Sequence, residues 1–305
     1  MDLEQAVNSR AESYNRTIKL AKILESCELC PRKCRVNRLR GERGYCRSGS
    51  ELVISSYGPH FGEESELVGS HGSGTVFMAN CNLQCVYCQN YDISQLGYGE
   101  EVSIDEVADI MLSLQVRDCH NINLVTPTHF APQLIQAVAA AGRRGLKIPI
   151  VWNCGGYENV EVIKLLKGFV DIYMPDMKYS EYEPAKRYSN APDYFERSRE
   201  AVLEMQRQVG DLKVDDRGVA YKGLLIRHLV LPNGLAGSEK ILEFIIREVS
   251  KDCYVNIMAQ YRPCGKASEY EPLSRRPTYG EYLRVVEYAR KLGLYRGLKS
   301  IHAYD

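Results

Sequence analysis

Apolar residues recur along most of the chain in two alternating patterns. Short continuous apolar runs predict buried strands, whereas apolar residues spaced three and four apart predict amphipathic helices. The strand-like segments are residues 75–79, 122–125, 148–152, 170–174, 224–231 and 254–258. The helix-like segments that follow them are 104–116, 131–144, 160–166, 194–209, 238–249 and 279–292. Such alternation favours parallel strands joined by right-handed crossovers, so we predict an α/β fold, a partial TIM-type barrel of six βα repeats.

The start of the chain follows a different pattern. Residues 3–24 carry apolar side chains at near-helical spacing among charges, which predicts an amphipathic helix. A strand is predicted at 52–55, and the glycine- and proline-containing stretch 58–64 is expected to break it. We therefore divide the chain into an N-terminal helix with a Cys-rich metal-binding extension, 1–70, and the barrel, 71–305.

Length and charge narrow the class of protein. The 305 residues, 45% of them hydrophobic, are enough for one large core. Lys and Arg total 39 and balance 39 Asp and Glu, so no global field favours nucleic acid or an anionic membrane. No apolar run approaches the roughly 20 residues of a membrane span, and the polar start is no signal peptide. We expect a cytoplasmic protein with no membrane association and no clear nucleic-acid binding.

Seven of the 11 cysteines fall into two groups, which favours metal ligation in a reducing compartment. Cys81, Cys85 and Cys88 have the spacing C-x3-C-x2-C, directly after an apolar run. Three thiolates on one tight loop can ligate three irons of a 4Fe-4S cube and leave the fourth iron open and reactive. The alternatives are half a zinc site or three structural thiols, because C-x-x-C alone is common.

The other group, Cys27, Cys30, Cys34 and Cys46, has the spacing C-x2-C-x3-C-x11-C. Four thiolates can close a tetrahedral zinc site or hold a second iron–sulfur cluster, and idle thiols are the third alternative. We slightly favour structural zinc, because a closed four-thiolate site needs no open position and this segment lies outside the barrel repeats. The basic residues around these cysteines form a run of a kind that is usually only solvated, but they can also offset thiolate charge or guide an acidic partner; they are Arg32, Lys33, Arg35, Arg38, Arg40, Arg43 and Arg47.

The octet 81–88, with Tyr87 before its third cysteine and Gly-Ser-Gly-Thr at 72–75, resembles the radical S-adenosylmethionine (SAM) enzymes. Within them it is similar to the glycyl-radical-enzyme activases related to the pyruvate formate-lyase activating enzyme, PflX-type branch. The resemblance covers about residues 27–262. It implies that the open iron binds SAM and that one electron cleaves SAM to methionine and a 5′-deoxyadenosyl radical. That radical removes hydrogen from the substrate. An electron donor such as flavodoxin or ferredoxin is also implied.

Functional groups in such barrels lie at the C-terminal ends of the strands. Many radical SAM enzymes read the SAM amino group with a Gly-Gly-Glu-Pro turn after the second strand, which this chain lacks. The departure leaves that task to Thr126, Thr128 or their carbonyls. His129 can face the pocket as a proton donor or cap the next helix, and we expect His60 to be an ordinary loop histidine.

The next two strand ends resemble activase signatures. Asn153 lies in a segment similar to their Thr-Asn-Gly turn, and Asp176-Met177-Lys178 resembles their Asp-Leu-Lys. Lys178 would pair with the SAM carboxylate. Asp176, with oxygens near Asn153 and Met174, could hold a monovalent cation beside the sulfonium. The alternative is a solvated salt bridge.

The last two strands complete the expected site. Arg227 belongs to a segment that looks like the family's Ile-Arg-x-x-x-x-Pro, and strand alternation prevents Arg227 and His228 from both facing the lumen. The family pattern places Arg227 near SAM. We expect Gln260 and Arg262 at the rim, near adenosine or substrate. Cofactor-binding candidates are thus Tyr87, Thr126, Thr128, Asn153, Asp176, Lys178, Arg227 and Gln260.

Four cysteines lack ligand spacing and are predicted to be buried thiols, with Cys154 the first candidate for an exception: Cys119, Cys154, Cys253 and Cys264. The functional prediction is an oxidoreductase-type radical SAM enzyme with a polypeptide substrate, because the characterised activases act on a glycine of a partner enzyme. A radical SAM enzyme that modifies a small molecule or RNA is one alternative. A non-enzymatic iron–sulfur binding protein is the other.

Overall fold

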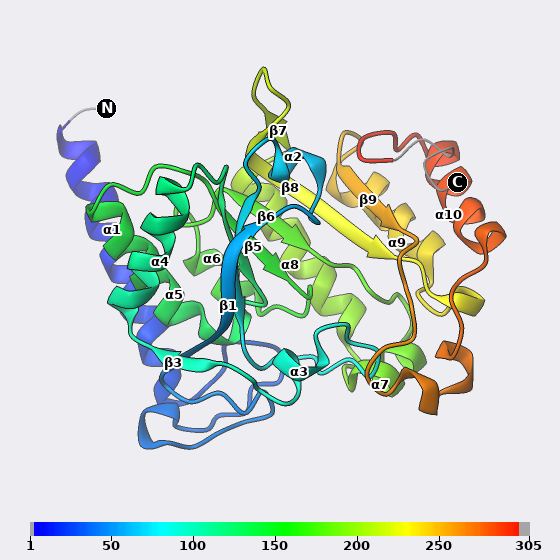
Figure 1. Cartoon of the computed structure of the whole chain (residues 1–305), viewed down its shortest axis with the longest axis horizontal. Coiled ribbons are helices and arrows are strands. Elements are labelled where there is room, and N and C mark those ends of the chain that lie inside the picture. The colour runs from blue at the N-terminus through cyan, green and yellow to red at the C-terminus, as the bar shows by residue number, and fades with distance from the viewer. Residues whose placement is uncertain (1–2, 299–305) are drawn as a thin grey trace.

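Six parallel strands form the centre of one nine-stranded sheet in the computed structural model, which describes residues 3–298 (Figure 1). These strands are β2 (Ser73–Met78), β4 (Ile122–Val125), β5 (Ile150–Cys154), β6 (Ile172–Pro175), β8 (Ala220–Leu229) and β9 (Tyr254–Met258). They pair side by side in that order, every pair parallel. The α/β partial barrel predicted from the alternation is therefore confirmed.

Three antiparallel strands extend the sheet at its margins: β1 (Leu52–His60), β3 (Glu100–Val102) and β7 (Lys213–Val214). The expectation that the strand at 52–55 breaks at residue 58 was wrong, since β1 pairs with β2 as far as His60. Across the described residues β3 pairs with β1 over Leu52–Ile54, so Pro59 lies on a strand edge, where a missing N–H group is tolerated.

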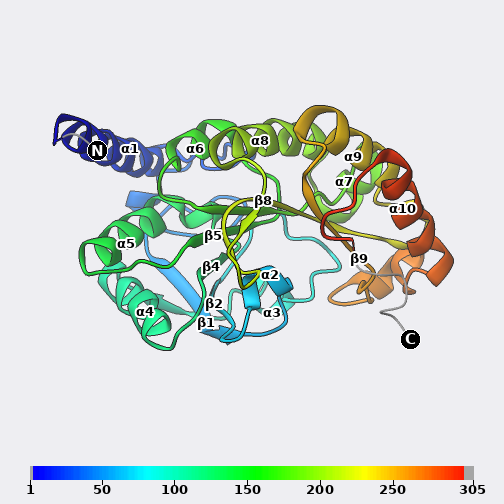
Figure 2. The same cartoon turned by 90° about the horizontal axis from the view of Figure 1, so that it is seen from above.

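Helices cover the outside of the curved sheet (Figure 2). They are α1 (Leu3–Lys22), α4 (Ile104–Val116), α5 (Ala131–Arg143), α6 (Val160–Leu165), α8 (Tyr194–Val209), α9 (Ser238–Phe244) and α10 (Tyr279–Leu292). Both α4 and α10 begin with a capping box, Ser103 with Glu106 and Thr278 with Glu281. Helix α9 passes into a wider turn at Ile245–Val249. Apolar spacing did not predict the short helices α2 (Ser65–Val68), α3 (Tyr91–Ser94) and α7 (Tyr182–Ser189).

The curved sheet does not close, and α2 lies on its open side, between β2 and β9 (Figure 2). Leu67 of α2 is fully buried and belongs to an apolar cluster with Ile172, Leu225 and Tyr254. The interior of the barrel is thus closed by side chains below the strand ends. The boundary at residue 70 stays a prediction, and β1 shares its sheet with the barrel strands. Within residues 3–298, no helix is both long and apolar enough to cross a membrane.

Candidate active site

The loop that carries Cys81, Cys85 and Cys88 follows β2 directly and rests on the end of β5. Two residues with left-handed backbone, Asn80 (φ 70°) and Gln84 (φ 54°), turn the chain here. Leu83 packs against Gly155, where an added Cβ would lie 2.8 Å from the Leu83 Cδ1 atom. A side chain at Gly155 would therefore push the cysteine loop away from the strand ends.

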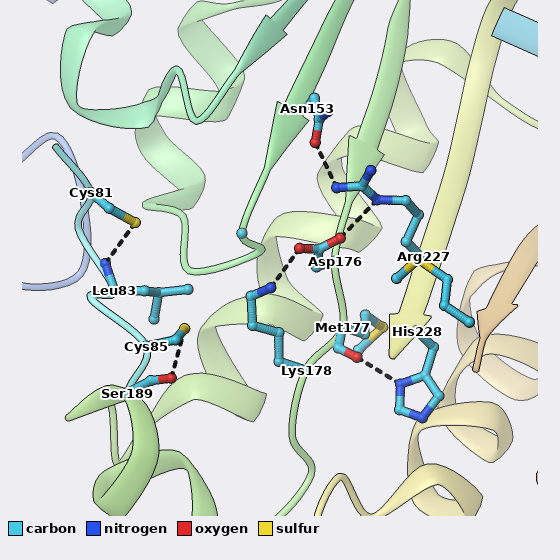
Figure 3. A network of polar contacts seen from close by, with 12 residues as sticks. Cys81, Leu83, Cys85, Asn153, Asp176, Met177, Lys178, Ser189, Arg227 and His228 are labelled. Carbon is cyan, nitrogen blue, oxygen red and sulfur yellow. Dashed lines mark hydrogen bonds and ion pairs between the residues drawn. The ribbon is translucent and has the colours of Figure 1, made fainter. Parts of the chain in front are cut away.

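Each of the three sulfur atoms accepts a hydrogen bond from the chain. The Leu83 N–H donates to Cys81 Sγ at 3.4 Å, Ser189 Oγ to Cys85 Sγ at 2.9 Å, and Ser94 Oγ to Cys88 Sγ at 3.2 Å. Figure 3 shows the first two. Donors of this kind stabilise negative charge on sulfur and tune the potential of an iron–sulfur cluster. The loop therefore fits three cluster ligands.

Burial raises the pKa of the Cys81 thiol to about 12, and it also raises the pKa of Cys85, partly opposed by the positive charge of Lys178. Metal ligation requires thiolates, so binding must displace these protons. Lys178 is the cation that lowers this cost at Cys85. Among residues 3–298, no three Cys, His, Asp or Glu side chains already form a site for a single metal ion.

A network of charged side chains joins the ends of β5, β6 and β8 beside the cysteine loop (Figure 3). The Asp176 carboxylate accepts from Lys178 Nζ at 2.6 Å and from Arg227 Nε at 2.8 Å. The Arg227 guanidinium also donates to Asn153 Oδ1 at 2.7 Å and to Glu63 Oε2 at 3.2 Å. Asp176, Lys178 and Arg227 are only 16–17% exposed, so this is not the solvated salt bridge considered as the alternative.

Opposite charges keep this network ionised. Burial alone would raise the pKa of Asp176, but Arg227 and Lys178 outweigh it and hold that pKa below its usual value. Burial likewise opposes the charges of Lys178 and Arg227, yet Asp176 raises the pKa of both. For Glu63 burial prevails over Arg227 and raises the pKa to about 7. The site therefore contains one carboxyl group that titrates near neutral pH.

Tyr194, which the sequence did not single out, holds two strand ends together. Its hydroxyl lies 2.8 Å from the carbonyl oxygens of both Gly155 and Asp176, and it accepts from the Lys178 N–H at 3.0 Å. Gly156 beside it has φ 78°, and a Cβ there would lie 2.1 Å from the Asp176 carbonyl oxygen. Only glycine fits at that position.

Other predicted cofactor residues lie in different surroundings. The Thr126 N–H donates to the Asn153 carbonyl at 2.8 Å, whereas buried Thr128 donates its hydroxyl to Glu158 at 2.5 Å. Tyr87 is buried edge-on between Tyr179 and Tyr261. Gln260 and Arg262 are exposed at the rim. Asn153, Asp176, Lys178 and Arg227 are thus brought into one network, while the Thr128 hydroxyl already has a partner.

The histidines His129, His228 and His60 differ in burial and in their contacts. His129 is buried and its Nε2 contacts the Ala79 carbonyl at 2.8 Å, and burial lowers its pKa to about 3. His228 lies on the opposite side of β8 from Arg227, where it contacts the Met177 carbonyl and Ser238 (Figure 3). His60 is exposed. A buried neutral ring bonded to a backbone carbonyl is a poor proton donor, which argues against that role for His129.

Sequence reasoning missed several polar residues of the barrel interior. Glu64 is buried and accepts from Asn256 Nδ2 at 2.9 Å. Asn123 lies two residues before Val125, the register partner of Asn153, so it points to the same side as Asn153. Neither amide atom of Asn123 has a hydrogen-bond partner in the described structure. A monovalent cation at Asp176 stays a prediction, and it would share the Asp176 and Asn153 oxygens with the bonds that Arg227 already donates to them.

A family model and two relatives match this chain. Residues 75–215 match the model of the radical SAM superfamily. The uncharacterized protein MJ0674 of Methanocaldococcus jannaschii is 37% identical over 289 residues, which cover 91% of this chain and 78% of that protein. MJ0808 of the same organism is 22% identical over 298 residues, covering 90% and 80%.

Among solved structures, a radical SAM methyltransferase from Sphaerobacter thermophilus superposes with a TM-score of 0.50 at 14% identity. The superposition covers 75% of this chain and 68% of that enzyme, and it shows a shared fold. The match to the superfamily model identifies residues 75–215 as a radical SAM superfamily domain.

Proposed function

We propose that this chain binds a 4Fe-4S cluster at Cys81, Cys85 and Cys88 and cleaves SAM reductively beside the network of Asp176, Lys178 and Arg227. One observation carries the proposal: three hydrogen-bonded cysteine sulfurs lie next to a buried, ionised network at parallel strand ends. When bound, the cluster supplies the electron that splits SAM into methionine and a 5′-deoxyadenosyl radical, which takes hydrogen from the substrate. The chain's own residues bind, orient and shield these groups.

Lys178 is the proposed partner of the SAM carboxylate. Its Nζ is held by Asp176 at 2.6 Å, and its charge also acts on the Cys85 thiol. A lysine fixed between the cysteine loop and β6 can place a carboxylate at the open iron. Because the group is mostly buried, the charge-assisted hydrogen bond would be stronger than one at the surface.

Asp176 supplies the matching negative charge for the sulfonium. Arg227 fixes that carboxylate through its Nε and fixes the Asn153 amide through a second nitrogen, so the three side chains keep one geometry. Arg227 therefore acts as a positioning residue. Thr126, whose N–H holds β4 to β5, is proposed to present its carbonyl to the SAM amino group, while Tyr87 and Gln260 flank the adenosine.

The proposed substrate is a polypeptide, as in the activases that the motifs resemble. Fold-level analogy is the main support. A second support is the exposed edge of β1 beside the open side of the barrel, with Tyr57 52% and Phe61 64% exposed. Exposed aromatic residues near a strand edge suit an extended peptide. Incubation with a peptide pool should give glycyl radicals or cross-links that depend on SAM; modification of small molecules or RNA alone would overturn this assignment.

The proposed electron donor is an acidic protein such as flavodoxin or ferredoxin. The segment that packs on the cysteine loop exposes Lys33, Arg35, Arg40, Arg43 and Arg47. Clustered positive charge steers an acidic partner and makes its association salt-dependent. Reduction by flavodoxin should therefore slow as ionic strength rises, and substitution of Arg40 and Arg43 by Glu should remove the salt dependence while dithionite still reduces the cluster.

The decisive experiment is dithionite-driven SAM cleavage by the anaerobically reconstituted chain. We expect 5′-deoxyadenosine to form with the parent and not with Cys81→Ala. Cys119→Ala is the matched control, since Cys119 is a buried cysteine that precedes β4, at the opposite end of the parallel strands from the cysteine loop. A chain that binds the cluster yet forms no 5′-deoxyadenosine would be an iron–sulfur binding protein and would overturn the proposal.

A further inference from the structure

We propose that Cys27, Cys30, Cys34 and Cys46 form a second, thiolate-bound metal centre that braces the Cys81–Cys88 loop through Arg32 and Tyr45. The bracing part rests on the proposed function of that loop, whereas the metal centre stands without it. No superfamily match covers these four cysteines, since the matched region begins at residue 75.

The backbone folds the first three of these cysteines into one knuckle. The Cys27 N–H donates to the Val36 carbonyl, and the Arg35 N–H donates to the Cys27 carbonyl, both at 2.9 Å. The fourth cysteine arrives through Gly44, where an added Cβ would lie 2.8 Å from Cys34 Sγ. Glycine therefore lets the chain pass directly over the sulfur, and the next N–H, of Tyr45, donates to that sulfur at 3.4 Å.

The four cysteines line one small, enclosed cavity of about 10 Å³, which His129 also lines. Cys27, Cys30 and Cys46 are at most 9% exposed. These side chains do not yet surround a single ion, so metal binding would draw the sulfurs together. Zinc is the expected metal because a closed four-thiolate site needs no open position and this segment lies outside the barrel repeats.

His129 is the independent sign that the cavity receives a ligand. Its Nε2 faces the Ala79 carbonyl, which can only accept, so the ring proton is on Nε2 and Nδ1 carries a lone pair. Nδ1 is buried without a hydrogen-bond partner in the described structure. Metal-binding histidines commonly donate their other N–H to a backbone carbonyl in this way. His129, which lines the same cavity as the four cysteines, is thus a candidate additional donor.

Arg32, between Cys30 and Cys34, reaches from this segment to the cysteine loop. Its Nε donates to the Asn82 carbonyl at 3.0 Å and its Nη2 to the Ser189 carbonyl at 2.9 Å, while Nη1 donates to the Asn190 carbonyl. Asn82 lies inside the loop, and Ser189 is the residue whose hydroxyl donates to Cys85 Sγ. One guanidinium therefore fixes both the loop and its hydrogen-bond donor.

Tyr45 makes the second connection. Its ring stacks on the Arg32 guanidinium at 3.7 Å, and its carbonyl accepts from Gln84 Nε2 at 2.7 Å. The N–H of the same residue donates to Cys34 Sγ. A metal that fixes Cys34 and Cys46 would thereby fix Tyr45, Arg32 and the loop in turn.

Metal analysis tests the centre. The chain with Cys81, Cys85 and Cys88 all replaced by Ala keeps only the N-terminal set, and we expect about one zinc per chain after anaerobic purification. About four irons per chain would support the centre as a cube in place of zinc. Adding Cys30→Ala should remove the metal, and adding Cys253→Ala, another buried cysteine, should not. Neither zinc nor iron in the triple variant would overturn the proposal.

Alkylation of the unmodified chain tests the same point without substitutions. Mass spectrometry should find Cys27, Cys30, Cys34 and Cys46 protected before treatment with a strong chelator and labelled after it. Labelling that is equal before and after would overturn the metal centre. Neither readout involves SAM, so failure of SAM cleavage with a filled N-terminal site would overturn the proposed function alone.

Hydrogen exchange tests the brace. Arg32→Lys keeps the positive charge but cannot make the three hydrogen bonds of the guanidinium. Amide hydrogen exchange across residues 82–90 should therefore speed up by about tenfold. The matched control is Arg35→Lys, whose side chain is 72% exposed and pairs with Glu28. Removal of the N-terminal metal should give the same acceleration. Unchanged exchange in both Arg32→Lys and the metal-depleted chain would overturn the brace.

Discussion

The two cysteine groups lie against each other, yet their surroundings differ in kind. The N-terminal group lines a closed cavity in a segment shaped by turns and single backbone hydrogen bonds. The Cys81–Cys88 group lies at the C-terminal end of a parallel strand, beside the buried ions Asp176 and Lys178. The first arrangement suits a metal held for stability, and the second suits a metal that must leave room for a ligand.

The hydrogen bonds to sulfur sharpen this difference. Two side-chain hydroxyls, of Ser189 and Ser94, donate to the sulfurs of the second group. In the first group the donor to Cys34 is a backbone N–H. Side-chain donors can be substituted without altering the path of the backbone. The reduction potential of a cluster held by the second group could therefore be changed without changing the fold of its loop. The comparison can be tested by substitutions that should affect one group and spare the other.

The largest effect is expected when each group loses one ligand. Cys85→Ala should lower 5′-deoxyadenosine formation to background and remove the cluster, while the N-terminal metal stays. Cys30→Ala should lose the N-terminal metal and keep four irons at the other loop. Metal content and SAM cleavage, measured on both variants beside Cys119→Ala, check the pair. Loss of both metals in both variants would show that the two groups form one site.

Lys178→Met should weaken SAM binding about tenfold to a hundredfold. The loss of a charge-assisted hydrogen bond of roughly 1.5–3 kcal/mol corresponds to that change in Kd. The cluster and the N-terminal metal should both remain. Equilibrium binding of SAM to the oxidised, cluster-loaded protein, followed by titration calorimetry, measures the Kd without cleavage. Lys164→Met, at an exposed lysine paired with Glu161, is the control, and equal affinities in the two variants would remove Lys178 from the SAM site.

The parallel core of the fold was predictable because buried strands and amphipathic helices give different patterns of apolar residues. Strands give short continuous apolar runs, and helices give apolar residues spaced three and four apart. The strand at 122–125 was predicted to the residue. Helix α7 was missed because it is short, and its last residue, Ser189, nevertheless donates to Cys85 Sγ. The extension of β1 to His60 was missed because Gly58 and Pro59 look like breakers and only the sheet shows that they lie on an edge.

The site was predictable where residues follow strands and obscure where they come from loops. Asp176, Lys178 and Arg227 are near strand ends, and their convergence follows from parallel pairing. Glu63 reaches Arg227 from a loop that precedes β2, a contact 164 residues apart in sequence that no local pattern encodes. The same holds for Arg32, which donates to backbone carbonyl groups. Every residue has such a carbonyl, so the amino-acid sequence does not show which residues Arg32 contacts.

Glu63 should make the stability of the chain depend on pH. Burial raises its pKa from 4.5 to about 7, so the native state holds the proton more tightly than the unfolded chain does. The free energy of unfolding should therefore fall as pH rises from about 4.5 to about 7, and level off above that. Glu63→Gln cannot ionise and should flatten this slope in denaturant titrations at several pH values.

Other buried groups contribute to the same titration, so the Glu63 effect is a difference between variant and parent. Burial also raises the pKa of Glu158 to about 7, which adds a slope of the same sign. Burial lowers the pKa of His129 and His228, which adds a slope of opposite sign below pH 6.5. Glu158→Gln is the matched variant, far from Arg227 in its contacts. An unchanged slope in Glu63→Gln would mean that Arg227 keeps Glu63 ionised throughout.

The smallest effect should come from Ser189→Ala, which removes one hydrogen bond to Cys85 Sγ and leaves the ligand in place. A donor to sulfur stabilises the more negative, reduced cluster, so its loss should make the reduction potential more negative. A hydrogen bond of about 0.5–1.5 kcal/mol corresponds to roughly 20–65 mV for one electron. Redox titration of the cluster measures the shift, with Ser198→Ala as the control because Ser198 is equally buried but bonded to no sulfur among the described contacts.

A shift in the positive direction, or none, would mean that the Ser189 hydroxyl turns away from the sulfur once the cluster is bound. Zinc content at the N-terminal cysteines should be the same in both variants, which keeps the effect on one side of the comparison.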